Sequence, residues 1–136
     1  MIKTTPMFHR FVSNNIETGL GFKFGYESTN VAPDITYRVG ECGGNFTTQT
    51  GIFTSPSFPD KYPSTADCVY TISRPNGTLI RITFMSMDLE GSDWLGCQDY
   101  LEIRDGKFGD SSLLDKVCSN DIPAPIMSTQ NNVWMR

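Results

Sequence analysis

The stretch of residues 87–106 concentrates acidic side chains. Asp88, Glu90, Asp93 and Asp99 lie within twelve positions, and Cys97 lies among them. Carboxylates this close repel one another unless water, a cation or a basic partner offsets their charge. Oxygen ligands on a loop are the kind that calcium selects. The stretch is therefore a candidate site for calcium or a basic partner, and the alternative is a solvated loop tip between two strands.

Strands must hold this loop in place. Residues 79–84 alternate in polarity, which predicts a half-buried strand with Ile80, Ile82 and Phe84 on one face. Residues 100–104 predict a second strand, which ends at the Asp105-Gly106 turn. Further short strands are expected at residues 8–13, 20–26, 68–72, 113–118 and 133–136. Because no segment reads as a helix of convincing length, we expect an all-β chain, folded as an antiparallel sandwich.

Two other segments do not read as central strands. Residues 51–63 contain Pro56, Pro59 and Pro63, and proline cannot donate a hydrogen bond within a sheet. We interpret this segment as an extended edge or a loop. Residues 27–41 show no sustained periodicity and are interpreted as a linker.

The overall charge excludes some classes of partner. The net charge is −4 and the pI is near 4.8, so no basic patch is present to neutralise the phosphates of a nucleic acid. No apolar run approaches the length of a membrane span, and the first residues lack the apolar core of a signal peptide. We interpret the N-terminus as a cut, or an added Met, inside a longer secreted chain.

The cysteines and glycosylation motifs point to the secretory pathway. The four cysteines are widely spaced, which is poor for zinc and suited to two disulfides. Three connectivities are open, and pairing of sequence neighbours would close short loops worth about 3 kcal/mol each in the chain-entropy model. Asn45 and Asn76 each begin an acceptor sequon for N-glycosylation. The cysteines are Cys42, Cys68, Cys97 and Cys118.

Catalysis finds little support in the residue types. His9 is the only histidine, and no Ser-His-Asp or Cys-His arrangement can be assembled from residues 42–136. A carboxylate pair such as Glu90 with Asp99 or Glu102 is conceivable for a glycosidase, but nothing indicates a sugar cleft. We therefore expect a protein that is not an enzyme.

A series of motifs follows in order from residue 42 onward. In this order and spacing, the motifs closely resemble the CUB domain family over residues 42–136. They are Cys42-Gly43-Gly44, Thr54-Ser55-Pro56-Ser57-Phe58-Pro59, Lys61-Tyr62-Pro63, Cys68-Val69-Tyr70-Thr71-Ile72, Asp88-Leu89-Glu90, Cys97-Gln98-Asp99-Tyr100-Leu101-Glu102-Ile103 and Asp105-Gly106.

The resemblance implies a two-sheet, jelly-roll-like β-sandwich of about ten strands. It also implies disulfides Cys42–Cys68 and Cys97–Cys118, and an extracellular, non-catalytic binding module. Tandem arrays with short linkers are similar to this chain, which implies a multi-CUB endocytic receptor, peripheral at the cell surface, of the kind that takes up protein-bound cobalamin. Its partners would be neighbouring CUB domains, protein ligands and a membrane-anchored co-receptor. The alternative is a CUB module of a secreted protease or adhesin that binds proteins or carbohydrate.

The resemblance also implies an incomplete domain. A whole CUB domain would continue past residue 136 with two more strands. Residues 1–29 resemble that missing ending, so they are expected to be the last strands of a preceding CUB domain, or strands that complete the sandwich as in a circular permutant. Residues 30–41 would be the linker, and residues 42–136 a CUB domain without its last two strands.

In calcium-binding members of the family, two acidic positions correspond to Glu90 and Asp99. A third family ligand lies beyond residue 136, and its counterpart in the N-terminal segment is Asn14, a neutral ligand. Calcium would order the loop so that its carboxylates accept hydrogen bonds from a lysine or arginine of the partner. Trp94 lies beside them in the sequence and is a candidate apolar anchor, and the alternative is a partly buried loop residue. The expected ligand-binding residues are Asp88, Glu90, Asp93, Trp94 and Asp99.

Overall fold

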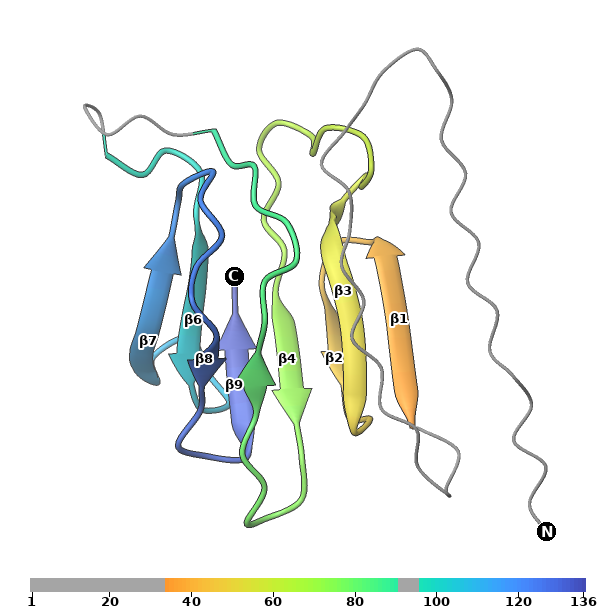
Figure 1. The fold of residues 1–136 in the computed structure, drawn as a ribbon, viewed down its shortest axis with the longest axis vertical. Coiled ribbons are helices and arrows are strands. Elements are labelled where there is room, and N and C mark those ends of the chain that lie inside the picture. The colour runs from red at the N-terminus through yellow and green to blue at the C-terminus, as the bar shows by residue number, and fades with distance from the viewer. Residues whose placement is uncertain (1–33, 91–95) are drawn as a thin grey trace, which may run out of the picture.

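The structure of the chain is a computed structural model, which describes residues 34–90 and 96–136. Within these ranges the protein contains strands and no helix, which confirms the all-β fold class. Accordingly, the described residues include no helix long and apolar enough to cross a membrane. The strands, shown in Figure 1, are β1 (Ile35–Gly40), β2 (Gly44–Phe46), β3 (Thr50–Pro56), β4 (Tyr70–Ser73), β5 (Arg81–Ile82), β6 (Leu101–Asp105), β7 (Ser112–Val117), β8 (Ile126–Met127) and β9 (Asn132–Met135).

A five-stranded sheet in the order β2-β4-β9-β6-β7 forms the larger layer (Figure 1). Its central strand, β9, runs antiparallel to both β4 and β6. Alternation along these strands turns Ile103, Val133 and Met135 inward, and none of the three is exposed to solvent. The last strand in the sequence is therefore at the middle of the sheet and carries much of the core.

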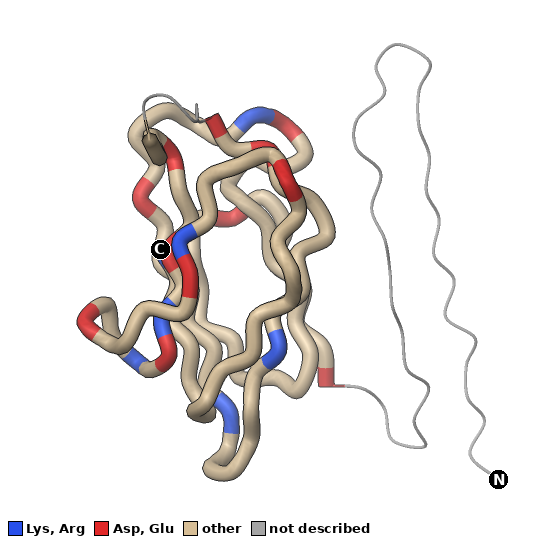
Figure 2. The backbone as a smooth tube through the Cα atoms, turned by 60° about the vertical axis from the view of Figure 1, so that its left-hand side comes forward, with Lys and Arg blue, Asp and Glu red and all other residues tan. Residues whose placement is uncertain are grey.

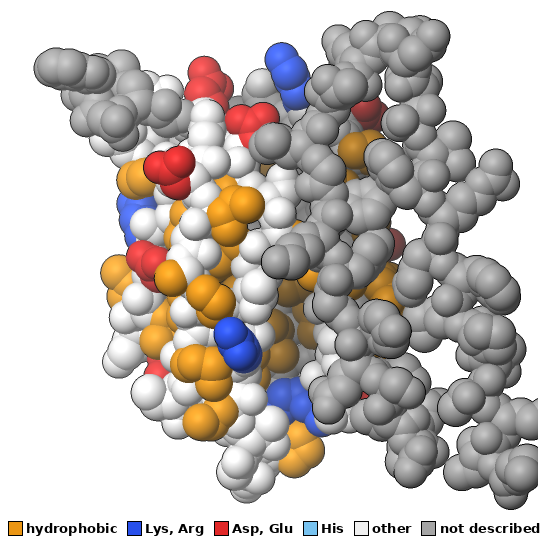
Figure 3. Space-filling model, in the orientation of Figure 1, with side chains coloured by type: hydrophobic (Ala, Val, Ile, Leu, Met, Phe, Trp, Pro, Cys, Tyr) orange, Lys and Arg blue, Asp and Glu red, His pale blue; other side chains and the backbone are white. Residues whose placement is uncertain are grey.

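The second layer is a short antiparallel pair, β5 with β8. Ile80 is buried, and Ile82 and Ile126 pack against the core residues of the larger sheet, so the two layers form a sandwich. Leu79 and Met127 remain 56% and 50% exposed. Figure 3 shows hydrophobic side chains at the surface of this face of the molecule. The small second layer therefore leaves apolar surface on the outside.

The strand expected at residues 79–84 is shorter than predicted, because only Arg81 and Ile82 pair with β8. Its common face is nevertheless correct, since Ile80 is buried while Ile82 and Phe84 both pack on the core. The alternating pattern therefore predicted which side chains are inside, although the backbone pairs over two residues only.

Two strand pairs are parallel, so the sheets of this sandwich are mixed and not antiparallel throughout. β1 pairs with β3, and β2 pairs with β4, both in parallel. β2 belongs to the larger sheet and lies between β1 and β3 in sequence. The chain therefore leaves the sheet of β1, passes through β2 in the larger sheet, and returns as β3 beside β1. A parallel pair needs a crossover connection of this kind.

Part of the predicted linker is also a regular strand. Residues 30–41 were interpreted as a linker, and within them β1 occupies positions 35–40 and pairs with β3. The burial of its side chains does not alternate, so the strand is held by backbone pairing without the hydrophobic periodicity that would reveal it. β3 lies in this two-stranded sheet and ends at Pro56, in agreement with the expected edge position.

The disulfides join sequence neighbours, as the resemblance implied. Cys42 pairs with Cys68 and ties the chain before β2 to the chain before β4. Cys97 pairs with Cys118 and ties the chain before β6 to the end of β7. Two disulfides fit an oxidising, extracellular compartment. The expected strands at residues 8–13 and 20–26, and the assignment of residues 1–29, lie outside the described residues.

Candidate metal and ligand site

The acidic segment is positioned by the apolar residues that alternate with its carboxylates. Met87 is buried and Leu89 packs against the core, so the backbone here is fixed to the sandwich. Asp88 and Glu90 alternate with them and are exposed. The sequence Met-Asp-Leu-Glu thus anchors one face and presents two carboxylates to solvent on the other.

Tyr62 joins two parts of the acidic stretch. Its hydroxyl donates a hydrogen bond to Oδ2 of Asp99 at 2.7 Å and accepts one from the backbone N–H of Glu90 at 2.9 Å. The backbone N–H of Asp99 also donates to the carbonyl oxygen of Glu90 at 3.2 Å. These bonds place Glu90 and Asp99 side by side although nine positions separate them in sequence.

The ionisation of Tyr62 supports this arrangement. Burial raises the pKa of the Tyr62 phenol, and the hydrogen bond that it donates to Asp99 raises that pKa further, while the bond from the Glu90 N–H opposes the shift. The phenol is therefore neutral at physiological pH and keeps the proton that it donates. Asp99 accepts this bond as a carboxylate, which makes the bond charge-assisted.

Asp99 is also fixed through the chain on either side of it. Two residues before it, Cys97 is tied to Cys118 at the end of β7. Two residues after it, β6 begins at Leu101. A disulfide, a strand and the Tyr62 hydrogen bond thus hold this carboxylate, so its position costs little further ordering when a ligand binds.

The structure brings together only part of the predicted site. Glu90 and Asp99 are adjacent, and Asp88 is exposed nearby in the chain, whereas Asp93, Trp94 and Asn14 lie outside the described residues. Within residues 34–90 and 96–136, no cluster of three or more His, Cys, Asp or Glu side chains is arranged to hold a metal. Two carboxylates are hard oxygen donors that fit part of the six to eight positions calcium takes.

Tyr62 is the site residue that sequence reasoning missed. The structure places this side chain half-buried, with its hydroxyl in the acidic stretch. No local pattern in the sequence marks this role, because the partners of the Tyr62 hydroxyl lie 28 and 37 positions away.

Several acidic residues and the asparagines of both glycosylation motifs lie at exposed positions. Several Asp and Glu positions lie at the upper end of the molecule in Figure 2. Asn45 is exposed on β2, and Asn76 is exposed in the turn that follows β4. Both sequons therefore present their asparagine to solvent.

Comparisons with known proteins agree with the fold. Tolloid-like protein 2 of Mus musculus is 35% identical over 93% of this chain, and the bone morphogenetic protein 1 homolog of Strongylocentrotus purpuratus is 36% identical over 80%. Cubilin of Homo sapiens is 33% identical over 96% of this chain. The chain spans only 11%, 17% and 4% of the lengths of these three relatives. The model of the CUB domain matches residues 42–136, and the chain therefore belongs to the CUB domain family.

Proposed function

We propose that residues 42–136 are a non-catalytic, extracellular protein-binding module of a multi-CUB endocytic receptor. The acidic stretch binds lysine or arginine side chains of protein ligands. The observation that carries this proposal is the Tyr62 hydroxyl, which holds Asp99 against the backbone of Glu90. This arrangement fixes the Asp99 carboxylate beside the backbone of Glu90, and the free oxygen of that carboxylate can accept a charge-assisted hydrogen bond.

Calcium would add positive charge beside these carboxylates and keep them ionised. Glu90 and Asp99 are the residues of this chain that would hold the ion, with water and donors from outside the described residues completing the shell. Asp88 lies exposed one residue from the buried Met87 anchor and would accept from a basic partner. Asp93 would do the same, and Trp94 would supply an apolar contact.

The proposed partners are inferred from the net charge of the chain and from its similarity to cubilin. A net charge of −4 suits protein ligands with exposed lysine or arginine. Similarity to cubilin over 96% of the chain supports a tandem array, in which neighbouring CUB domains and a membrane-anchored co-receptor would complete the receptor at the cell surface.

A second candidate rests on the similarity to Tolloid-like protein 2, which reaches 40% identity to the human protein over 73% of the chain. In that case the module would serve a secreted protease or an adhesin, through contacts with proteins or carbohydrate. The sequence of the parent protein after residue 136 separates the two. A further Cys-Gly-Gly start favours the receptor array, and a protease motif favours the alternative.

Calorimetric titration with calcium tests the proposed site. We expect binding to residues 1–136 and tighter binding to a version extended through the next two strands. Glu90→Ala and Asp99→Ala should abolish the heat signal in both. Asp121→Ala is the matched control, since it removes an exposed carboxylate on the connection between β7 and β8. Absence of binding at millimolar calcium in both versions would refute the calcium part of the proposal.

Binding of a lysine-rich peptide tests the ligand part separately. The affinity should fall as salt rises, because the interaction is between charges near the surface. Glu90→Ala and Asp99→Ala should weaken the peptide complex, whereas Asp121→Ala should leave it unchanged. Equal affinity in all the variants would place the ligand on another face of the sandwich.

A further inference from the structure

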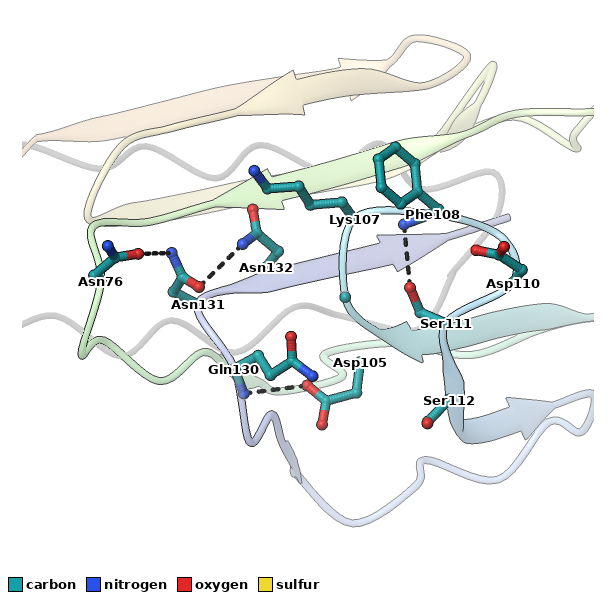
Figure 4. A pocket seen from close by; sticks show the side chains of 11 residues that line it. Asn76, Asp105, Lys107, Phe108, Asp110, Ser111, Ser112, Gln130, Asn131 and Asn132 are labelled. Carbon is teal, nitrogen blue, oxygen red and sulfur yellow. Dashed lines mark hydrogen bonds between the residues drawn. The ribbon is translucent and has the colours of Figure 1, made fainter.

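A polar pocket lies where three turns meet, at the end of the sandwich away from the acidic stretch (Figures 1 and 4). The turns are those between β4 and β5, between β6 and β7, and between β8 and β9. Its volume of about 560 Å³ falls in the range of roughly 300–1,000 Å³ typical of small-molecule sites. The pocket is lined mainly by polar side chains, among them Asn76, Lys107, Asp110, Gln130 and Asn132.

Hydrogen bonds join two of these turns, β6–β7 and β8–β9. Asp105 is 6% exposed, and its carboxylate accepts bonds from the backbone N–H groups of Thr129 at 3.1 Å and Gln130 at 3.3 Å. Ser111 Oγ accepts a bond from the backbone N–H of Phe108 at 3.3 Å. The carboxylate of Asp105 is therefore used within the fold, and the pocket has a preformed floor.

Other polar groups in the pocket are not used in this way. Among the pocket residues drawn in Figure 4, none hydrogen-bonds to the side-chain groups of Lys107, Asp110 or Gln130. Phe108 lies near Lys107 and Asp110, across the pocket from Gln130, and is 66% exposed (Figure 4). Amide, ammonium and carboxylate groups around an exposed aromatic ring suit a sugar, because hydroxyls bind the polar groups and the C–H face of a pyranose packs on the ring.

The pocket also contains a residue that can carry a sugar. Asn76 begins the sequon Asn76-Gly77-Thr78 in an exposed turn, which is closed by the Thr78 N–H to the carbonyl of Pro75 at 3.2 Å. Asn131 Nδ2 donates to Asn76 Oδ1 at 3.3 Å, which orients the Asn76 amide. An N-linked sugar attaches to Nδ2 and leaves Oδ1 as an acceptor, so this hydrogen bond is compatible with glycosylation.

We propose that Asn76 carries an N-linked glycan whose first sugars lie in this pocket, against Phe108 and Gln130. Attachment forms a bond between Nδ2 and the anomeric carbon of the first sugar. The bond from that carbon to the diphosphate of a lipid-linked donor breaks, the diphosphate leaves with the electron pair, and one Nδ2 proton is released. Figure 4 places Asn76 at one end of the pocket, with Phe108 farther along, so a chain of sugars can follow it.

The other sequon does not have this surrounding. Asn45 lies on β2, an edge strand of the larger sheet, and it does not line the pocket. A glycan at Asn45 would extend from the sheet edge into solvent. The two sites therefore differ in how well the fold holds their sugars.

The rate of enzymatic release tests the proposal. The chain is secreted from eukaryotic cells, Asn76 occupancy is measured by mass spectrometry, and the glycan is released with peptide N-glycosidase from folded and unfolded protein. We expect release from the folded protein to be at least about tenfold slower, which corresponds to about 1.4 kcal/mol of protection. The double variant Phe108→Ala/Gln130→Ala should restore most of the rate. Tyr37→Ala removes an exposed aromatic ring on β1 and should leave the rate unchanged.

Three results would overturn the proposal. They are a secreted chain with no glycan at Asn76, release that is as fast from folded as from unfolded protein, and slow release that persists in the double variant. Because Phe108 and Gln130 are exposed, their replacement should not unfold the chain, and urea denaturation of the variants verifies this.

Discussion

Replacing Tyr62 by phenylalanine tests the central contact of the acidic stretch. The substitution removes only the hydroxyl, which donates to Asp99 at 2.7 Å and accepts from Glu90 at 2.9 Å. A neutral hydrogen bond contributes about 1 kcal/mol and one to a charged group about 1.5–3 kcal/mol, so the two together give at most about 4 kcal/mol. Tyr62 is half-buried, so water can replace part of the lost hydrogen bonding. We therefore expect the free energy of unfolding to fall by about 1–2 kcal/mol.

Two measurements check this expectation. Urea denaturation at 25 °C gives the change in the free energy of unfolding. Amide hydrogen exchange gives the local effect, because the Glu90 N–H loses its acceptor and should exchange faster in Tyr62→Phe under conditions where the fold stays intact. The calcium affinity of the extended chain should also fall, since the Asp99 carboxylate loses the hydrogen bond that orients it.

Tyr70→Phe is the matched control. The Tyr70 hydroxyl lies 3.1 Å from the carbonyl oxygen of Thr54 and 3.2 Å from that of Glu41, away from the acidic stretch. Its loss should cost a comparable amount of about 1–2 kcal/mol without changing exchange at Glu90 or calcium affinity. If Tyr62→Phe leaves Glu90 exchange unchanged, or if Tyr70→Phe changes it equally, the role assigned to Tyr62 is refuted.

Three further predictions concern the fold outside the acidic stretch. Asp105→Asn should lower the free energy of unfolding, measured by urea denaturation, by about 2–4 kcal/mol. The reason is that the substitution removes the charge of a buried carboxylate that accepts several hydrogen bonds. A loss of stability below about 1 kcal/mol would contradict this. Gly43→Ala should lower the free energy of unfolding by at least about 3 kcal/mol, because φ is +76° and the added Cβ would lie 2.5 Å from a backbone oxygen. Gly77→Ala should lower it by only about 1–2 kcal/mol, because φ is +83° but no atom lies near the added Cβ. Equal losses of stability in the two variants would disprove the steric argument. The hydrogen bond from Arg136 holds the pKa of Asp67 below its usual value, so this pair stabilises the fold above about pH 3.9 and the effect is lost as pH falls through the lower folded pKa. Carbon NMR titration should show the Asp67 pKa rising in Arg136→Gln, and an unchanged pKa would exclude the pair as its cause.

Strand identity could be predicted where side chains alternate between the core and solvent. The strand β6 was predicted from the alternation of Leu101 and Ile103 and from the Asp105-Gly106 turn. The structure contains the strand at these positions. The central position of β9 could not be predicted, because four alternating residues indicate a strand and not its neighbours. β1 could not be predicted at all, since its pairing depends on the backbone of β3 and not on its own side chains.

The candidate site, like the fold, could be predicted from the sequence only in part. Carboxylate spacing and family motifs indicated Glu90 and Asp99, and the structure places them side by side. The contribution of Tyr62 depends on contacts across 28 and 37 positions of sequence, which no local pattern encodes. Long-range contacts of this kind become visible only when the fold brings the loops together.

The two proposed sites lie at opposite ends of the same strand. Asp99 precedes β6 and Asp105 ends it, so the strand separates the acidic stretch from the pocket by about 17 Å at 3.3–3.4 Å per residue. A glycan held at Asn76 would therefore leave the acidic end free for a protein ligand (Figures 1 and 4). Because Asp105 is used to hold the turns around the pocket and Asp99 is held by Tyr62, replacing one should not disturb the other site. Additive losses of stability in Tyr62→Phe/Asp105→Asn would be the thermodynamic signature of this separation, and an interaction energy above about 0.5 kcal/mol would show that the two ends are coupled.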